Sequence, residues 1–115
     1  MKSLMLVVSM ILSLMVISCG PKTVKEAQTD KLHDAVEDGN VEGVKQAILK
    51  EADVNGKAGF ADETPLHIAV KEGRFEIIKI LIANGAFVNV RDAFGLTPLY
   101  VAAYYGRPKA AKILL

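Results

Sequence analysis

The sequence lacks tryptophan and has only one cysteine, Cys19, among its 115 residues. A single cysteine cannot form an intramolecular disulfide, and no paired-cysteine spacing for a zinc site is present. There is also no excess of basic charge, because 14 Lys and Arg residues stand against 13 Asp and Glu residues. This balance argues against a nucleic-acid-binding surface, which requires a basic patch. The sequence has neither a Gly-x-Ser-x-Gly nucleophile elbow nor a phosphate-binding loop, so we expect no enzyme activity and no cofactor.

The first 18 residues contain Leu4–Ile17, a run of 14 uncharged and mostly apolar residues after Lys2. That length suits the apolar region of a signal peptide, whereas a membrane-spanning helix needs about 20 residues. The end of the run, Val16-Ile17-Ser18-Cys19, is similar to the cleavage box of bacterial lipoproteins. The resemblance implies that residues 1–18 are removed and that Cys19 carries a thioether-linked diacylglycerol and an acylated amino group, palmitate included. The alternative is an ordinary secretory signal in which Cys19 has no role.

Removal of residues 1–18 takes away Lys2 alone among the charged residues and leaves 13 basic and 13 acidic side chains. A lipidated Cys19 predicts a protein anchored in the bacterial cell envelope, with its domain in the periplasm or at the cell surface. Gly20, rather than the Asp that resembles an inner-membrane retention signal, favours the outer membrane.

Residues 19–30 follow the signal and contain few apolar side chains. We interpret them as the lipidated Cys and a flexible tether, before a domain over residues 31–115. The alternative is a helical extension of that domain, since Val24 and Ala27 are three residues apart.

The stretch Thr64–Asn89 predicts two short helices. Thr64 and Pro65 are typical of a helix start, and Gly73 is typical of the left-handed residue that ends a helix. The second helix has a wide apolar face between Phe75 and Ile82 and ends before Gly85. Such a unit cannot bury both of its apolar faces alone, so further copies are expected.

Two further copies are present. The segment Thr97–Ala103 repeats Thr64–Val70 at a spacing of 33, and Leu32–Val36 matches Leu66–Val70 at a spacing of 34. These copies resemble the ankyrin repeat, in which a Thr-Pro-Leu-His helix start is paired with a closing Gly-Ala-Asp-Val-Asn segment. The resemblance implies a mainly α solenoid of three helix pairs, with repeats at about 31–61, 62–94 and 95–115.

The outer copies depart from the family pattern. The first has Glu51 where the family prefers Gly, which costs about 1–2 kcal/mol if the left-handed conformation is kept, unless the turn is built differently. The third has Tyr100 in place of His, and Leu115 is reached before its closing segment. As the end of the stack, the first copy is expected to carry polar side chains on its outer face: Lys31, Asp34, Glu37, Asp38, Glu42 and Lys45.

The two histidines, His33 and His67, occupy the same repeat position. We considered a metal or catalytic role for them and favour a structural one. In the family, this His bonds to the helix-start Thr and to neighbouring loop backbone, and each copy needs that bond. No metal site is therefore expected.

The resemblance implies a binding surface made of the loops and the exposed ends of the first helices. Carried over position by position, this surface is acidic at the first copy and aromatic at the third. The predicted partner-binding residues are Phe60, Lys71, Glu72, Arg91, Phe94, Tyr104 and Tyr105. The predicted function is a membrane-anchored protein-interaction module for an envelope or extracellular protein, with no nucleic acid bound. The alternative is a structural element that self-associates through Ile113-Leu114-Leu115.

Overall fold

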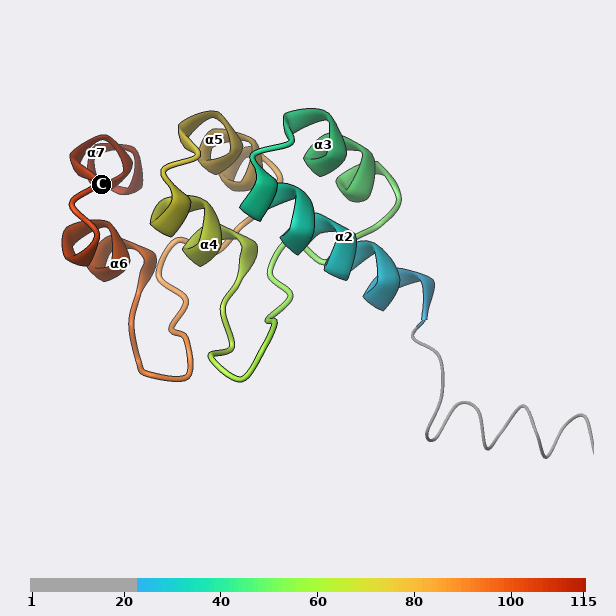
Figure 1. Ribbon diagram of the computed structural model, residues 1–115, viewed down its shortest axis with the longest axis horizontal. Coiled ribbons are helices and arrows are strands. Elements are labelled where there is room, and N and C mark those ends of the chain that lie inside the picture. Colours follow the sequence, from blue (N-terminus) through green and yellow to red (C-terminus); the bar gives the residue numbers. More distant parts are fainter. Residues whose placement is uncertain (1–22) are drawn as a thin grey trace, which may run out of the picture.

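The computed structural model describes residues 23–115, which form a row of helix pairs (Figure 1). In chain order the helices are α2 (Val24–Asp38), α3 (Val41–Leu49), α4 (Pro65–Glu72), α5 (Phe75–Ala83), α6 (Pro98–Tyr104) and α7 (Pro108–Leu114). No strand occurs in these residues, although Ala58 and Glu63 form one isolated antiparallel bridge. The prediction of a mainly α solenoid of three helix pairs is confirmed.

The helices form two layers. The inner helices α2, α4 and α6 pack side by side in one layer. The outer helices α3, α5 and α7 form the second layer, which lies above the first in Figure 1. The loops that precede α4 and α6 project together from one edge of the molecule, away from the outer layer. Each inner helix therefore presents its exposed side next to a loop.

The inner helices begin as the sequence predicts. The Thr64 hydroxyl accepts a hydrogen bond from the backbone N–H of His67 at 3.4 Å, and Pro65 occupies the first turn, where no donor is needed. Thr97 and Pro98 repeat this start in α6. Gly39 and Gly73 end α2 and α4 in the left-handed conformation, with φ of 73° and 69°.

The core lies between the two layers and runs through all three repeats. Its fully buried members are apolar side chains from helices α2 to α5 and small ones from α6 and α7. The largest of them are Leu32, Val36, Val44, Leu66, Val70, Ile77, Ile78 and Leu81. Packing of this kind supplies most of the stability of a solenoid, because each repeat buries its apolar faces against its neighbours.

Hydrogen bonds tie each repeat to the next. The Arg74 guanidinium donates to the backbone oxygen of Glu37 at 2.9 Å, and Arg107 donates twice to that of Lys71, at 3.1 and 3.2 Å. Both arginines therefore cap the last turn of the preceding inner helix, where carbonyl groups lack partners. A Cβ on Gly39 would lie 2.8 Å from Cζ of Arg74, so this glycine also makes room for the arginine. The sequence pattern did not predict these hydrogen bonds between repeats.

The tether prediction is wrong for residues 24–30, and the helical alternative holds. Helix α2 begins at Val24, because Thr23 and Glu26 form a reciprocal capping box. Thr29 is buried, and its hydroxyl accepts a hydrogen bond from the backbone N–H of Asp53 at 2.8 Å. The predicted signal peptide 1–18 and Cys19 lie outside the described residues.

The departures of the first repeat are accommodated. Glu51 keeps the left-handed conformation with φ of 68°, as its counterpart Gly85 does with φ of 93°. The six polar side chains predicted for the outer face are all exposed. Three of them, Lys31, Asp34 and Asp38, line a shallow depression between α2 and α3.

Candidate functional site

Aromatic side chains gather between the second and third repeats. They line a groove of about 360 Å³ that we call the aromatic groove. Its lining residues are Glu63, Asp92, Phe94, Leu96, Tyr100, Val101, Tyr104 and Tyr105. They come from α6 and the residue after it, from the loop before α6, and from Glu63, two residues before α4, so the groove depends on the stacking of two repeats.

Helix α6 supplies the tyrosines. Tyr104 and Tyr105 end the helix with their rings 5.1 Å apart, edge to face at 73°. Tyr104 is 74% exposed and Tyr105 47%. Tyr100, one turn earlier, is 55% exposed. Exposed aromatic rings that are held in a fixed arrangement can bury a large area on contact with little loss of conformational entropy.

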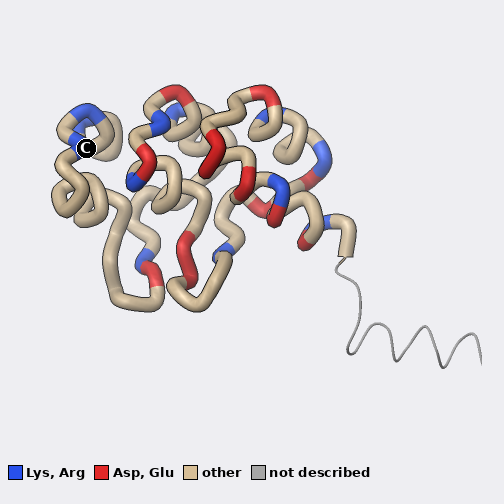
Figure 2. Tube along the Cα trace, in the orientation of Figure 1, with Lys and Arg blue, Asp and Glu red and all other residues tan. Residues whose placement is uncertain are grey.

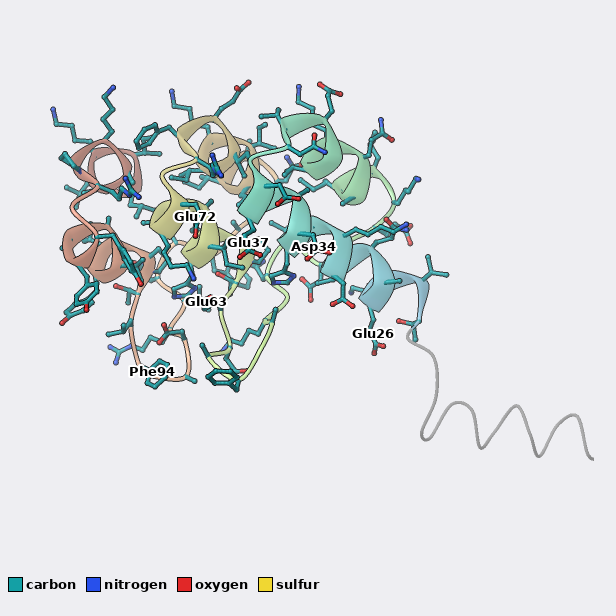
Figure 3. The ribbon with its side chains drawn as sticks, viewed as in Figure 1. Glu26, Asp34, Glu37, Glu63, Glu72 and Phe94 are labelled. Carbon is teal, nitrogen blue, oxygen red and sulfur yellow. The ribbon has the colours of Figure 1, made fainter. Side chains whose placement is uncertain are left out.

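The loop before α6 is shaped by Asp92. One carboxylate oxygen of Asp92 accepts hydrogen bonds from the backbone N–H groups of Phe94 and Leu96, both at 2.9 Å. This closed turn holds Phe94 at the end of its loop, where the ring points away from the helices (Figure 3). Phe94 is 70% exposed and forms the lower end of the groove.

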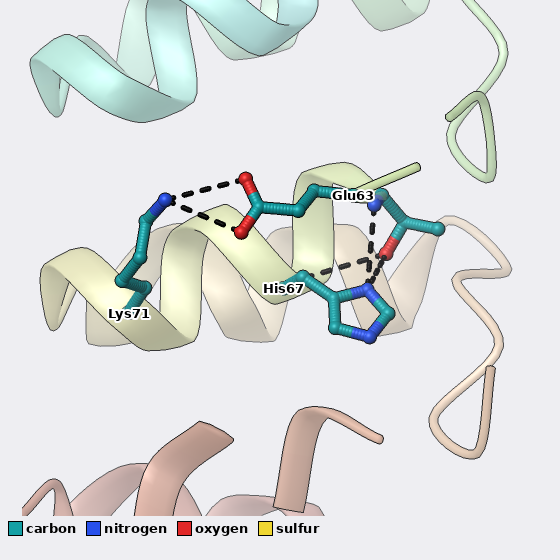
Figure 4. Close-up of polar contacts among 4 residues, drawn as sticks. Glu63, His67 and Lys71 are labelled. Atoms are coloured by element: carbon teal, nitrogen blue, oxygen red, sulfur yellow. Dashed lines mark hydrogen bonds and ion pairs between the residues drawn. The ribbon is translucent and has the colours of Figure 1, made fainter. Parts of the chain in front are cut away.

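An ion pair lies beside the groove. The Lys71 ammonium donates to both carboxylate oxygens of Glu63, at 3.2 and 3.3 Å (Figure 4). The two side chains are 28% and 26% exposed, so water screens the pair and its net contribution to stability is small. The main consequence of the pair is that the charge of Lys71, the one lysine on α4, is neutralised by Glu63 beside the groove.

The charge pattern changes along the inner layer. Figure 2 shows carboxylates over α2 and none on α6. Glu37 on α2 and Glu72 on α4 lie on the same side of the molecule as Glu63 (Figure 3). The predicted change from an acidic first repeat to an aromatic third repeat is therefore present in three dimensions.

The structure brings together only part of the predicted partner-binding set. Phe94, Tyr104 and Tyr105 meet in the aromatic groove. Lys71 reaches the groove through Glu63, whereas Glu72, Arg91 and Phe60 do not line it. Whether any of these residues contacts a partner stays a prediction.

Sequence reasoning missed several residues of the groove. Tyr100 was noted only because it replaces a His, and Glu63 and Asp92 were not predicted to contact a partner. The signal for Tyr100 was available, since a residue one helical turn before Tyr104 lies on the same face of α6.

Both histidines connect an inner helix to a loop: His67 does so at the start of α4, and His33 does so within α2. His67 is fully buried, and its Nε2–H donates to the backbone oxygen of Leu96 at 2.8 Å while Nδ1 accepts from Thr64. His33 lies 2.7 Å from the backbone oxygen of Thr29 through Nδ1 and 2.8 Å from that of Gly56 through Nε2. His67 thus holds the backbone of Leu96, one of the residues that line the aromatic groove. This agrees with the structural role predicted for His67.

Two further features are absent from residues 23–115. No group of three or more His, Cys, Asp and Glu side chains is arranged to hold a metal ion. No helix in this part of the chain is long and apolar enough to span a bilayer.

Comparison with known proteins places the repeats in a family. Residues 32–115 match the family model for ankyrin repeats in three copies. An ankyrin repeat protein of Rickettsia bellii is 38% identical over 98 residues, which cover 78% of this chain and 58% of that protein. Protein phosphatase 1 regulatory subunit 12A of Mus musculus is 44% identical over 52 residues, 45% of this chain and 5% of the subunit. The 2-5A-dependent ribonuclease of Mus musculus is 36% identical over 85 residues, 74% of this chain and 12% of that enzyme. The chain thus spans little more than half of the first of these relatives and far less of the others.

Proposed function

The chain belongs to the ankyrin-repeat family, whose repeats generally mediate protein–protein interaction without catalysis, and from this premise we propose that it is a lipid-anchored protein-binding module. Its action would be stoichiometric: the stacked repeats present a preformed surface to another protein of the envelope or the exterior. The partner would be a protein rather than a nucleic acid, and no enzyme activity is proposed.

The aromatic groove is the observation that carries this proposal. Tyrosine is one of the residue types that most often contribute a large share of binding energy at interfaces. Here Tyr100, Tyr104 and Tyr105 are exposed on one helix beside Phe94, with a volume between them that a partner side chain can fill. The groove is already formed, so binding would require little rearrangement of the backbone.

The anchor is supported by sequence alone. Val16-Ile17-Ser18-Cys19 resembles the lipoprotein cleavage box, and several acyl chains at Cys19 would make membrane attachment stable, at about 0.8 kcal/mol per buried methylene. We propose an envelope location on this basis, with the outer membrane favoured.

The test is a crosslinking pull-down from bacterial envelopes with the full lipidated chain. We expect a captured protein that is lost in the Tyr104→Ala/Tyr105→Ala variant. The matched control is Glu76→Ala/Lys79→Ala, which changes two exposed residues on the outer helix α5 and should retain the partner. Capture that is unaffected by the tyrosine variant, or lost equally in the control, would contradict the proposal.

Self-association is the alternative function. Ile113 and Leu114 are half-buried against the core, and Leu115 is 90% exposed. Sedimentation of the full chain in detergent, compared with Leu115→Asp, separates the two functions. A concentration-dependent dimer that is abolished by Leu115→Asp would support the self-association hypothesis. A monomer at all concentrations would exclude it.

A further inference from the structure

Two phenylalanine side chains project from the tips of neighbouring loops. Phe60 is 97% exposed and Phe94 is 70% exposed. Phe60 does not line the aromatic groove and is covered by almost nothing within residues 23–115. A nearly bare phenyl ring has no role in stabilising the fold, and exposed apolar side chains that occur together commonly mark a contact surface.

The two tips are held next to each other. The backbone N–H of Ala93 donates to the backbone oxygen of Ala61 at 2.9 Å, and the Lys57 ammonium donates to the backbone oxygen of Arg91 at 3.2 Å. These hydrogen bonds join the loop of Phe60 to the loop of Phe94. The pair of rings is therefore presented by one connected surface, which we call the loop-tip edge: residues 57–62 and 91–94.

The loop-tip edge lies on the side of the molecule opposite the outer helices. Figure 1 shows both loop tips along the lower margin and the first turn of α2 at the right-hand end of the row, with α3, α5 and α7 along the opposite margin. Val24 in that first turn is 76% exposed, and Lys25, Lys57 and Arg91 are exposed as well. Apolar side chains and charged side chains of both signs, Glu26 and Asp62 included, thus occur from the start of α2 to the loop tips.

The proposed lipid anchor would hold this part of the molecule near a membrane. Cys19 lies four residues before Thr23, and four residues span at most about 14 Å. A lipid on Cys19 would therefore keep the start of α2 close to the bilayer surface. We propose that the loop-tip edge rests on that surface, with Phe60 and Phe94 inserted among the lipid headgroups. This inference rests on the lipid anchor of the proposed function.

The chemistry suits a lipid interface. Aromatic rings are among the groups that peripheral proteins place at the boundary between headgroups and acyl chains. A contact of two rings would be weak for a free protein, but an anchored domain meets the bilayer at high effective concentration. Tyr104 and Tyr105 lie at the far end of α6 from the loops, so they would stay available to a partner. Phe60 and Phe94 would then contact lipid rather than a partner protein, and the part of the aromatic groove left for the partner would be the tyrosines Tyr100, Tyr104 and Tyr105.

The absence of tryptophan allows a direct test. Three single variants of the full lipidated chain, Phe60→Trp, Phe94→Trp and Phe87→Trp, are reconstituted in vesicles of phosphatidylethanolamine and phosphatidylglycerol. Phe87 is the matched control, because it is 66% exposed but follows α5 and lies outside the loop-tip edge. Flotation of the vesicles shows that the protein is attached, and circular dichroism shows that each variant is folded.

We expect tryptophan at 60 and 94 to emit at shorter wavelength on the vesicles and to lose fluorescence when the acyl chains are brominated, with tryptophan at 87 unchanged. Unchanged emission at 60 and 94 in protein that floats with the vesicles would overturn the inference and leave the anchor intact. Emission at 60 and 94 that responds only to added envelope protein would overturn it in favour of a protein contact. Protein that does not float would contradict the anchor itself, which is a failure of the proposed function.

Discussion

The first repeat differs from the other two at the residue that follows the glycine of its inner helix. Asn40 stands there in the first repeat, and its side chain accepts a hydrogen bond from the backbone N–H of Gly43 at 3.0 Å, which caps α3. Arg74 and Arg107 stand there in the later repeats, where they leave α5 and α7 without a side-chain cap and bond to the preceding repeat instead. The residue after the glycine thus stabilises its own repeat in the first copy, whereas in the later copies it bonds to the preceding repeat.

A second position shows the same division. Asp34 on α2 is exposed, whereas its counterparts Ile68 on α4 and Val101 on α6 are 8% and 6% exposed at the contact between repeats. All three copies have the same pair of helices, so these side chains decide which faces are packed and which meet water. The difference between the repeats can therefore be tested by exchanging residues between them.

The largest effect is expected from Ile68→Asp, which places the residue of the first repeat in the second. A carboxylate would be buried between two repeats without a partner, at a cost of about 4 kcal/mol in the free energy of unfolding. Urea denaturation followed by circular dichroism measures this cost. The reverse exchange, Asp34→Ile, should change stability by less than about 0.5 kcal/mol because the position is exposed. Equal effects of the two exchanges would mean that the repeats do not differ in this way.

The next effect is expected from His67→Ala. Loss of the imidazole leaves the buried Thr64 hydroxyl and the Leu96 backbone oxygen without their partner, at a cost of about 2–3 kcal/mol. Hydrogen exchange should also increase in the loop around Leu96, since this bond holds it. A variant with unchanged stability but altered metal binding would support the metal role that we did not favour.

A smaller effect is expected from Arg74→Asn. The variant loses a charge-assisted hydrogen bond to Glu37 but gains a helix cap like that of Asn40, so the net loss should be about 1 kcal/mol. The urea dependence of unfolding should become shallower, because the first repeat is less strongly coupled to the second. Asn40→Arg is the matched exchange and should lose the cap without gaining a bond to a neighbour. A steeper transition in Arg74→Asn would contradict this account of the arginine.

The smallest effect is expected from Glu51→Gly. Glu51 has φ of 68°, a conformation that glycine adopts without penalty, so the change should stabilise the domain by about 0.5 kcal/mol after the added flexibility of the unfolded chain. Gly85→Ala, at the matched position of the second repeat, should act in the opposite direction. Chemical denaturation of the two variants side by side measures both, and the same sign in both would be contrary to expectation.

The residues that shape the local backbone were readable from the sequence. Thr64-Pro65 and Gly73 predict helix ends because their effect depends on one or two neighbours, and the copies 33 and 34 residues apart indicate the stack. The start of α2 was missed although Thr23 and Glu26 form a local capping box, whereas the hydrogen bond that holds Thr29 comes from Asp53, far along the chain. The arginines were missed although Gly73-Arg74 recurs as Gly106-Arg107, because their partners belong to another repeat.

In the candidate site too, residues with a local signal were predicted and residues placed by distant contacts were not. Tyr104 and Tyr105 were predicted from their repeat position, whereas the contribution of Glu63 and Asp92 depends on how two loops meet at α6. Pairing of Lys71 with Glu63 was likewise not evident from their spacing, which spans the start of α4. Contacts within one element are predictable from pattern, and contacts that arise from stacking require the structure.

The most direct test of the proposed function is site-specific photocrosslinking in intact bacteria that produce the full chain. A benzophenone amino acid is placed at Tyr105, in the aromatic groove, and separately at Lys79, which is exposed on α5. The account predicts a protein adduct from position 105 that is absent from position 79. No adduct at 105, or the same adduct from both positions, would contradict a binding role for the groove.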